Sequence, residues 1–165
     1  MLMSPVIYTD LDGTLLDHDT YSADEAREVL SDLAARKVPV IPATSKTFAE
    51  VAHFRGQMSM DHAFIVENGA AVYVPIDLNI RCPIGSKIFE NYWVREFGVR
   101  RQALCDVIEA LDMPSRHSFK SLNDMRPSEV AEITGLDIES AKRAQIRLYS
   151  ETIDWRGKLA LIEAA

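Results

Sequence analysis

The sequence predicts an α/β fold with a parallel sheet, and three observations carry this prediction. Short apolar runs recur at 6–8, 38–41 and 63–66, and their lengths are typical of strands. Between the first two runs, apolar residues recur at helical spacing, namely Ala26, Val29, Leu30, Leu33 and Ala34. The connections are short, so strand, helix and strand are expected to form a βαβ unit with parallel strands.

Length and composition narrow the class of protein. The chain has 165 residues, of which 47% are hydrophobic and 26% are charged, and this suits one domain with a core or one domain plus part of another. A net charge of -7 argues against nucleic acid or an anionic membrane as the main partner. There is no signal-peptide pattern and no apolar run that approaches the roughly 20 residues of a membrane span. The two cysteines, Cys82 and Cys105, favour reduced thiols and hence a cytoplasmic protein.

Local signals predict the remaining elements of the first half. The run at 6–8 is expected to be a buried strand. Ser22 and Glu25 are spaced as a capping box for a helix that ends at about Arg36. Thr47 and Glu50 offer a second capping box, after which Phe48, Val51 and Ala52 begin another helical face. Asn68-Gly69, with apolar residues on both sides, predicts a hairpin turn.

The pattern loosens over 75–86, where Pro75, Pro83 and Gly85 favour a hinge, so we expect domains at 1–84 and 85–165. The second part is predicted to contain an amphipathic helix over 99–111. A further helix opens at Pro127 and closes at Gly135, and Asp137 caps one that runs to about Gln145. A partly alternating stretch from 146 to 153 is expected to be a strand that ends near Trp155.

Two aspartates follow the first apolar run directly. Asp10 and Asp12 would stand at the carboxyl end of that strand, where open α/β sheets place their ligands, and Gly13 allows a sharp turn. Two carboxylates so close repel each other, so a bound cation is the natural way to keep both ionised. The alternative is a pair of solvated turn aspartates.

A second polar cluster follows the second apolar run. Thr44, Ser45 and Lys46 lie between the end of a strand and the start of a helix. Hydroxyls, free backbone N–H groups and a lysine at such a place form a phosphate site. The alternative is that Ser45 or Thr47 only caps the helix and that Lys46 is solvated.

The stretch Asp10-Leu-Asp-Gly-Thr-Leu15 resembles the first signature of the haloacid dehalogenase (HAD) superfamily of phosphotransferases. The resemblance implies a Rossmann-like core, here with an incomplete parallel sheet, and a partial α+β cap domain. It also implies that Asp10 is the nucleophile, that Asp12 is the general acid/base, and that both help to hold Mg²⁺. Thr44 matches the second motif, and Gly13, Ser45 and Lys46 would bind phosphate with it.

The Ser-Lys-Thr that follows Thr44 is similar to the mannosyl-3-phosphoglycerate phosphatase branch of that superfamily. In this branch Glu67 and Asn68 would border the active site and contact substrate, although a plain turn is the alternative. Residues 130–136, 141–144 and 147–155 resemble parts of the branch's cap domain. There Arg147, Ser150 and Glu151 would face the phosphoglycerate group, and the alternative is a surface strand with a paired arginine.

Two motifs of the resembled family have no match in the sequence. These are the third-motif lysine and the Gly-Asp-x-x-Asn-Asp segment that completes the Mg²⁺ site, so the chain is expected to end inside the cap. An incomplete sheet would have an open edge, which favours self-association into a homo-oligomer. One hypothesis is therefore a Mg²⁺-dependent phosphatase for mannosyl-3-phosphoglycerate or a related phosphorylated sugar. The other is a catalytically impaired remnant or a module that binds phosphorylated ligands.

Overall fold

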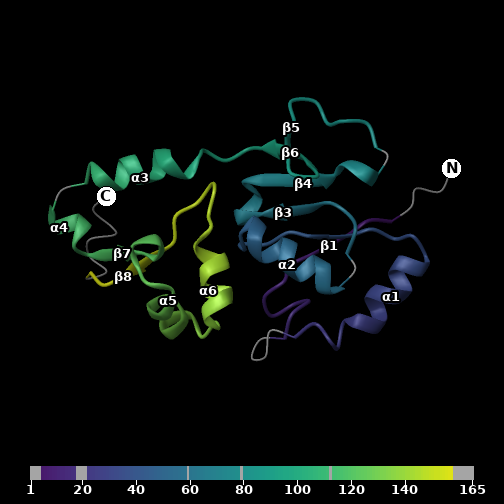
Figure 1. Cartoon of the computed structure of the whole chain (residues 1–165), viewed down its shortest axis with the longest axis horizontal. Helices are drawn as coiled ribbons and strands as arrows, with labels where there is room; N and C mark the ends of the chain where they lie inside the picture. Colours follow the sequence, from purple (N-terminus) through teal and green to yellow (C-terminus); the bar gives the residue numbers. More distant parts are fainter. Residues whose placement is uncertain (1–4, 18–21, 59, 79, 112, 158–165) are drawn as a thin grey trace. The chain divides into compact units, whose positions relative to one another are not determined.

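The computed structural model describes residues 5–17, 22–58, 60–78, 80–111 and 113–157 (Figure 1). The chain divides into two compact units, residues 1–98 and 99–165. The division falls later than the expected boundary at 84, because β6 (Tyr92–Glu96) pairs along its whole length with β4 (Ala71–Pro75). The N–H groups of Phe97 and Gly98 also donate to the carbonyl of Ala70, so the first unit extends to Gly98.

The first unit begins with the predicted βαβ arrangement. Strand β1 (Ile7–Thr9) pairs in parallel with β2 (Val40–Pro42), and helix α1 (Arg27–Ala35) connects them. Ala43 then bridges in parallel to Ile65 in β3 (Phe64–Val66). The carboxyl ends of the three strands therefore meet at one edge, as the sequence predicted for a sheet of this class.

Strand β3 turns back into an antiparallel sheet. Its strand order is β3-β4-β6-β5, with β5 at Lys87–Phe89, and the stack is visible in Figure 1. Short 3₁₀ turns at Glu67–Gly69 and Ile76–Leu78 flank β4. Among the described residues of the first unit, β1, β2 and the bridge to β3 are paired in parallel, and the pairings of β3, β4, β6 and β5 are antiparallel.

An aromatic cluster under helix α2 (Phe48–Met58) forms the core of the antiparallel part. The ring of Phe48 lies 4.6 Å from that of Tyr73 and 5.9 Å from that of Phe64, measured between centroids. The guanidinium of Arg55 lies 4.6 Å from the centroid of Phe64 and donates to the backbone oxygen of His62. Burial lowers the pKa of Arg55 below its ordinary value. The aromatic faces and the carbonyl of His62 surround this partly desolvated cation.

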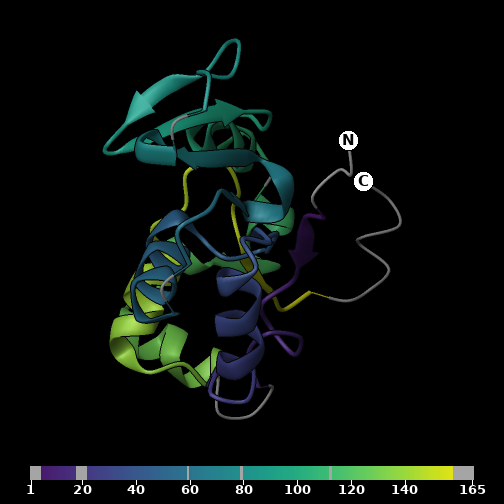
Figure 2. The same cartoon turned by 90° about the vertical axis from the view of Figure 1, so that its right-hand side faces the viewer.

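Two expectations for the first unit are wrong. Strand β1 is not buried, because Ile7 is 37% exposed and Tyr8 is 64% exposed. Among the described residues β1 pairs only with β2, so its other side faces outward (Figure 2). The capping box at Ser22 does not start α1. The helix begins at Arg27 after a turn, and its N-cap is Ala26, which makes no side-chain cap.

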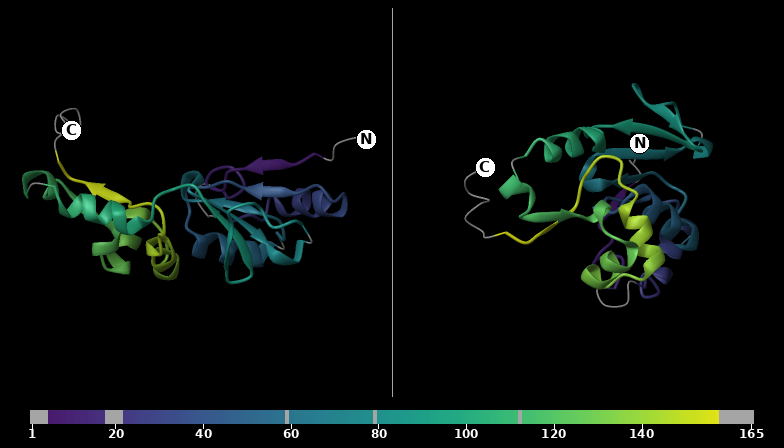
Figure 3. Two further views of the ribbon diagram at one scale, coloured as in Figure 1. Left: turned by 90° about the horizontal axis from the view of Figure 1, so that it is seen from above. Right: turned by 60° about the vertical axis from the view of Figure 1, so that its left-hand side comes forward.

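The second unit is an α+β assembly around a short antiparallel ladder. Strands β7 (Phe119–Ser121) and β8 (Ile153–Trp155) pair, and helices α5 (Pro127–Thr134) and α6 (Ile138–Gln145) lie side by side (Figure 3). Helices α3 (Arg101–Glu109) and α4 (Met113–Arg116) precede β7, and a 3₁₀ turn at Leu122–Asp124 follows it. The small core comprises Leu122, Met125, Val130 and Ala141, with Ala131 and Leu136 packed against it.

The caps of α5 and α6 confirm the sequence reading. Pro127 opens α5, and Gly135 closes it with a φ of 76° in the left-handed region. The Asp137 carboxylate accepts from the backbone N–H groups of Glu139 and Ser140 at 2.9 and 3.0 Å. The expected strand from 146 to about Trp155 is confirmed at its end, where β8 covers Ile153–Trp155, and is wrong over 146–152.

Within the described ranges, no helix is both long enough and apolar enough to cross a membrane.

Candidate functional site

The first part of the candidate site is the turn that follows β1. Leu11 is completely buried, and its carbonyl accepts from the N–H groups of Thr14 and Leu16 at 3.2 and 2.8 Å. Gly13 completes the turn with a φ of 64°. Because Leu11 points inward, the residues on either side of it, Asp10 and Asp12, stay exposed. One oxygen of Asp10 accepts from the N–H of Leu11 at 2.7 Å, which fixes the direction of that carboxylate.

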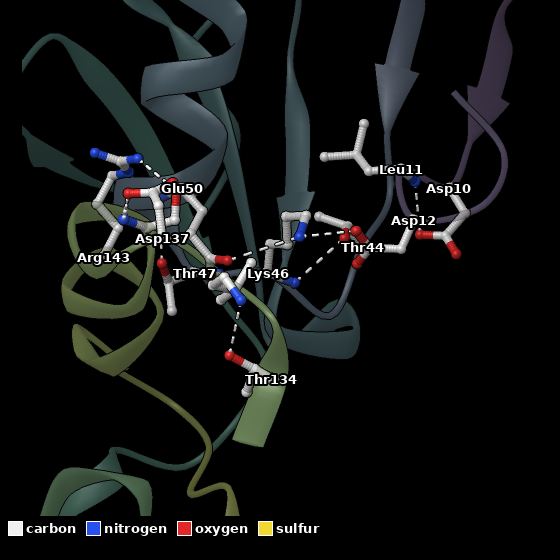
Figure 4. Close-up of polar contacts among 12 residues, drawn as sticks. Asp10, Leu11, Asp12, Thr44, Lys46, Thr47, Glu50, Thr134, Asp137 and Arg143 are labelled. Atoms are coloured by element: carbon white, nitrogen blue, oxygen red, sulfur yellow. Dashed lines mark hydrogen bonds and ion pairs between the residues drawn. The ribbon is translucent and has the colours of Figure 1, made fainter. Parts of the chain in front are cut away.

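The loop after β2 supplies the second part of the site. The Nζ of Lys46 lies 2.8 Å from Oδ1 of Asp12 and 3.7 Å from Oε1 of Glu50 (Figure 4). The hydroxyl of Thr44, which is only 4% exposed, accepts from the N–H of Lys46 at 3.2 Å. The side chain of Lys46 is 14% exposed, so the alternative of a solvated lysine is wrong. The structure thus brings the two predicted polar clusters together.

Helix α2 begins at this loop with the predicted capping box. The Thr47 hydroxyl accepts from the N–H of Glu50 at 3.2 Å, and Oε2 of Glu50 accepts from the N–H of Thr47 at 2.8 Å. The other carboxylate oxygen of Glu50 faces Lys46, so one side chain both caps the helix and contacts the site lysine. Sequence reasoning found this cap but missed the contact, which the i,i+4 spacing of Lys46 and Glu50 could have indicated. Ser45, between these groups, is exposed.

The turn between β3 and β4 is fastened to the same loop. The backbone N–H of Glu67 donates to the carbonyl of Lys46, and that of Asn68 donates to the carbonyl of Thr44, each at 3.0 Å. Glu67, Asn68 and Gly69 have φ values of 48°, 59° and 89°, so all three are in the left-handed region. The predicted hairpin is confirmed, with a four-residue connection in place of a two-residue turn. Glu67 is buried and Asn68 is exposed at this junction.

The donors present suit a hard cation only in part. Asp10 and Asp12 offer carboxylate oxygens, which are the ligands that Mg²⁺ prefers. No group of three or more His, Cys, Asp or Glu side chains that could hold a metal occurs among the described residues. Mg²⁺ commonly uses one or two carboxylates together with water and substrate phosphate, so the pair fits such a site if other oxygens complete the octahedron.

The three predicted substrate residues of the second unit are arranged in two ways. The Nε of Arg147 donates to the hydroxyl of Ser150 at 2.8 Å, so these two side chains are held together. The Glu151 side chain is 4% exposed, forms an ion pair with Arg101 and accepts from the hydroxyl of Ser121 at 2.5 Å. Sequence reasoning missed Arg101 and Ser121, because they lie far from Glu151 in sequence and no local pattern marks them.

A hollow of about 640 Å³ in the first unit is separate from these groups. Its lining includes Leu30, Lys37, Val40, Met60 and His62, and none of the predicted site residues. Val40 begins β2, whereas the polar loop follows the end of that strand. The hollow therefore lies toward the amino end of the strand, away from the paired charges.

Comparison with known proteins gives concordant results. Residues 7–87 match the family model of haloacid dehalogenase-like hydrolases. A glucosyl-3-phosphoglycerate/mannosyl-3-phosphoglycerate phosphatase of Methanococcoides burtonii is 40% identical over 154 residues, which are 90% of this chain and 55% of that protein. The protein of the same description from Persephonella marina is 34% identical over 149 residues, with 88% of this chain and 53% of that protein covered. The chain spans about half the length of these curated relatives.

Among solved structures, the phosphatase BT1666 of Bacteroides thetaiotaomicron, from the haloalkanoate (HAD) enzyme superfamily, superposes with a TM-score of 0.52. It is 19% identical, and the superposition covers 83% of this chain and 51% of that chain, which supports the fold. The matched segment contains both polar loops and their strands. The family match and the curated relatives together show that residues 7–87 are similar to the haloacid dehalogenase-like hydrolases.

Proposed function

We propose that the chain carries the phosphoryl-transfer groups of a Mg²⁺-dependent phosphatase that acts on a sugar-phosphoglycerate. One observation carries the proposal. The Asp12–Lys46 ion pair, at 2.8 Å, joins the loop that holds Asp10 to the loop that holds Thr44. A nucleophilic carboxylate, an acid/base carboxylate and phosphate-binding donors thus stand at one sheet edge. The relatives described as sugar-phosphoglycerate phosphatases support the substrate class.

In the proposed reaction, an oxygen of Asp10 attacks phosphorus and the bond from phosphorus to the glycerate oxygen breaks. Asp12 gives a proton to that leaving oxygen, then takes one from the water that hydrolyses the aspartyl-phosphate. Thr44, Ser45, Lys46 and the Gly13 turn would donate to the phosphoryl oxygens. Mg²⁺ held by the Asp10 carboxylate and the Asp12 backbone carbonyl would neutralise charge on the phosphoryl group.

The finer assignments follow from the same proposal. Residues 1–98 would be the core, and residues 99–165 would be part of the cap. Glu67 and Asn68 would border the substrate, and Arg147 with Ser150 would meet its carboxylate or phosphate. Cys82 and Cys105 are free thiols, which suits a cytoplasmic enzyme. The side of β1 that pairs with no other described strand would be the edge for self-association into a homo-oligomer.

A second candidate function is weak binding of phosphorylated ligands without catalysis. The observation that favours it is the donor set of the described residues, which holds no cluster of three metal-binding side chains. With fewer fixed oxygens, Mg²⁺ would be bound weakly and transfer would be slow.

Phosphate release by the purified 165-residue chain tests the proposal. Mannosyl-3-phosphoglycerate and glucosyl-3-phosphoglycerate are supplied with Mg²⁺, and parallel samples contain a chelator. Asp10→Asn is expected to reduce the rate at least about a thousandfold, because it removes the nucleophile. Asp32→Asn, at an exposed position of α1, is the matched control and should match the parent.

Equal rates of phosphate release by the parent and by Asp10→Asn would refute the proposal that the chain is a phosphatase. If no phosphate is released, but calorimetry shows that the parent and Asp10→Asn both bind the substrate, the chain is a binding module and not an enzyme.

A further inference from the structure

The Glu151 carboxylate is committed to contacts inside the second unit. Its Oε1 accepts from the Ser121 hydroxyl at 2.5 Å, and its Oε2 pairs with the Arg101 guanidinium. The Cys105 thiol lies 3.8 Å from the same Oε2. With only 4% of the side chain exposed, both oxygens are already engaged. A ligand could reach this carboxylate only by breaking a charge-assisted contact in a buried place.

The same contacts belong to a wider attachment of the segment 146–152. The carbonyl of Leu148 accepts from the N–H of Arg101, at the first position of α3, at 2.8 Å. The guanidinium of Arg100 lies 5.2 Å from the centroid of the buried Tyr149 ring. Thr152 is held by an N–H from Leu122 at 2.9 Å. An irregular segment is thereby fixed by the start of α3 and the end of β7, without pairing as a strand.

The Arg147–Ser150 pair lies within this attached segment. The two side chains meet at 2.8 Å across the two intervening residues, Leu148 and Tyr149, both of which are bound by the start of α3. Removing the Glu151 charge would leave Arg101, whose side chain is only 22% exposed, without its anionic partner. A partly buried cation that loses its partner is destabilised, so Arg101 would turn outward and release the segment.

We propose that Glu151 is a positioning residue, which holds segment 146–150 and its Arg147–Ser150 pair against the first turn of α3. It acts through Arg101 and Ser121 and does not contact the substrate. The role of the Arg147–Ser150 pair toward a phosphoglycerate rests on the proposed function, whereas the holding of the segment does not.

Hydrogen–deuterium exchange of the full 165-residue chain tests the holding of the segment directly. Glu151→Gln and Arg101→Met should each speed exchange of the 147–150 amides about tenfold, which corresponds to about 1.4 kcal/mol. Amides of α5 and α6 should exchange as in the parent, because their core does not include Glu151. Glu139→Gln is the matched control, since it removes an exposed ion pair with Lys142 in the same unit. The proposal would be overturned if the 147–150 amides of Glu151→Gln exchanged at the parent's rate, or if amides throughout the second unit exchanged faster.

Calorimetric affinity for mannosyl-3-phosphoglycerate separates positioning from direct contact. Each single variant should bind about tenfold more weakly, and the double variant should bind no more weakly than either one, because both break one connection. If the double variant instead bound about a hundredfold more weakly, the two residues would act independently, and the proposal that Glu151 acts through Arg101 would be overturned. If the parent binds no ligand, the proposed function fails, and the exchange result alone decides whether Glu151 positions the segment.

Discussion

Substitutions at Thr47 test whether the cap of α2 stabilises the loop that carries the candidate phosphate site. Thr47 is completely buried, and its hydroxyl accepts from the N–H of Glu50 at 3.2 Å. Thr47→Val keeps the volume but removes this bond, and losing an N-cap costs about 1 kcal/mol. Thr47→Ser keeps the bond but removes one methyl group, and burial of such a group contributes about 0.8 kcal/mol. Thr47→Ala removes both, so the expected loss is the sum, about 2 kcal/mol.

Urea unfolding followed by tryptophan fluorescence measures these losses in the first unit. The chain has two tryptophans, Trp93 in the first unit and Trp155 in the second. A Trp155→Phe background keeps an aromatic ring beside Phe119 and leaves Trp93 as the only reporter. A Thr47→Val variant as stable as its background would refute the assignment of a stabilising cap. A Thr47→Ser variant as unstable as Thr47→Ala would refute it equally.

Two further predictions concern the pH dependence and the backbone. The N–H of Arg126 and the ammonium of Lys120 lower the pKa of Glu129 from 4.5 to about 2, so its contribution is complete above about pH 4.5 and is lost as pH falls toward 2. Glu129→Gln should therefore flatten the acid dependence of the second unit's urea midpoint, and an unchanged slope would contradict this. Gly56→Ala, at an exposed helical position with open space, should raise stability by about 0.5–1 kcal/mol. Gly69→Ala, at a φ of 89°, should lower stability by about 1–2 kcal/mol. If the urea midpoint shifted in the same direction in Gly56→Ala and Gly69→Ala, the backbone conformations assigned to these glycines would be contradicted.

Local signals in the sequence predicted those features that depend on a few neighbouring residues. The capping box at Thr47, the cap at Asp137 and the closing glycine at Gly135 were all confirmed. Each is set by one side chain and the backbone within four residues of it. The same spacing at Ser22 and Glu25 nevertheless does not start α1, so spacing alone is not sufficient. The hairpin at Asn68-Gly69 belongs to the same class, since left-handed φ values favour those two residues.

Features that depend on what packs against a segment were not predicted. The apolar run that forms β1 resembled a buried strand, but burial requires a neighbour on each side, and β1 pairs only with β2 among the described residues. The stretch from 146 to 152 alternates like a strand, yet its carbonyls at Leu148 and Thr152 accept from Arg101 and Leu122. Tertiary hydrogen bonds replaced the ladder that the periodicity indicated.

For the candidate site, the sequence predicted which residues would gather but not how they would pair. Asp12 and Lys46 were both singled out, and the parallel strand ends explain why they meet. Their ion pair could not be predicted, because it depends on the turn geometry at Gly13 and on the start of α2. Glu151 shows the same limit, since its burial depends on α3 and β7, which are distant in sequence.

The run of left-handed residues from Glu67 to Gly69 has a practical consequence for engineering. Surface hairpin turns are ordinarily good places for insertions, tags and altered loop lengths. This turn is different, because its N–H groups at Glu67 and Asn68 hold the carbonyls of Lys46 and Thr44. An added residue would have to break one of those bonds or shift the loop after β2. The β3–β4 turn and that loop must therefore be redesigned as one piece, and peptide insertions belong elsewhere in the chain.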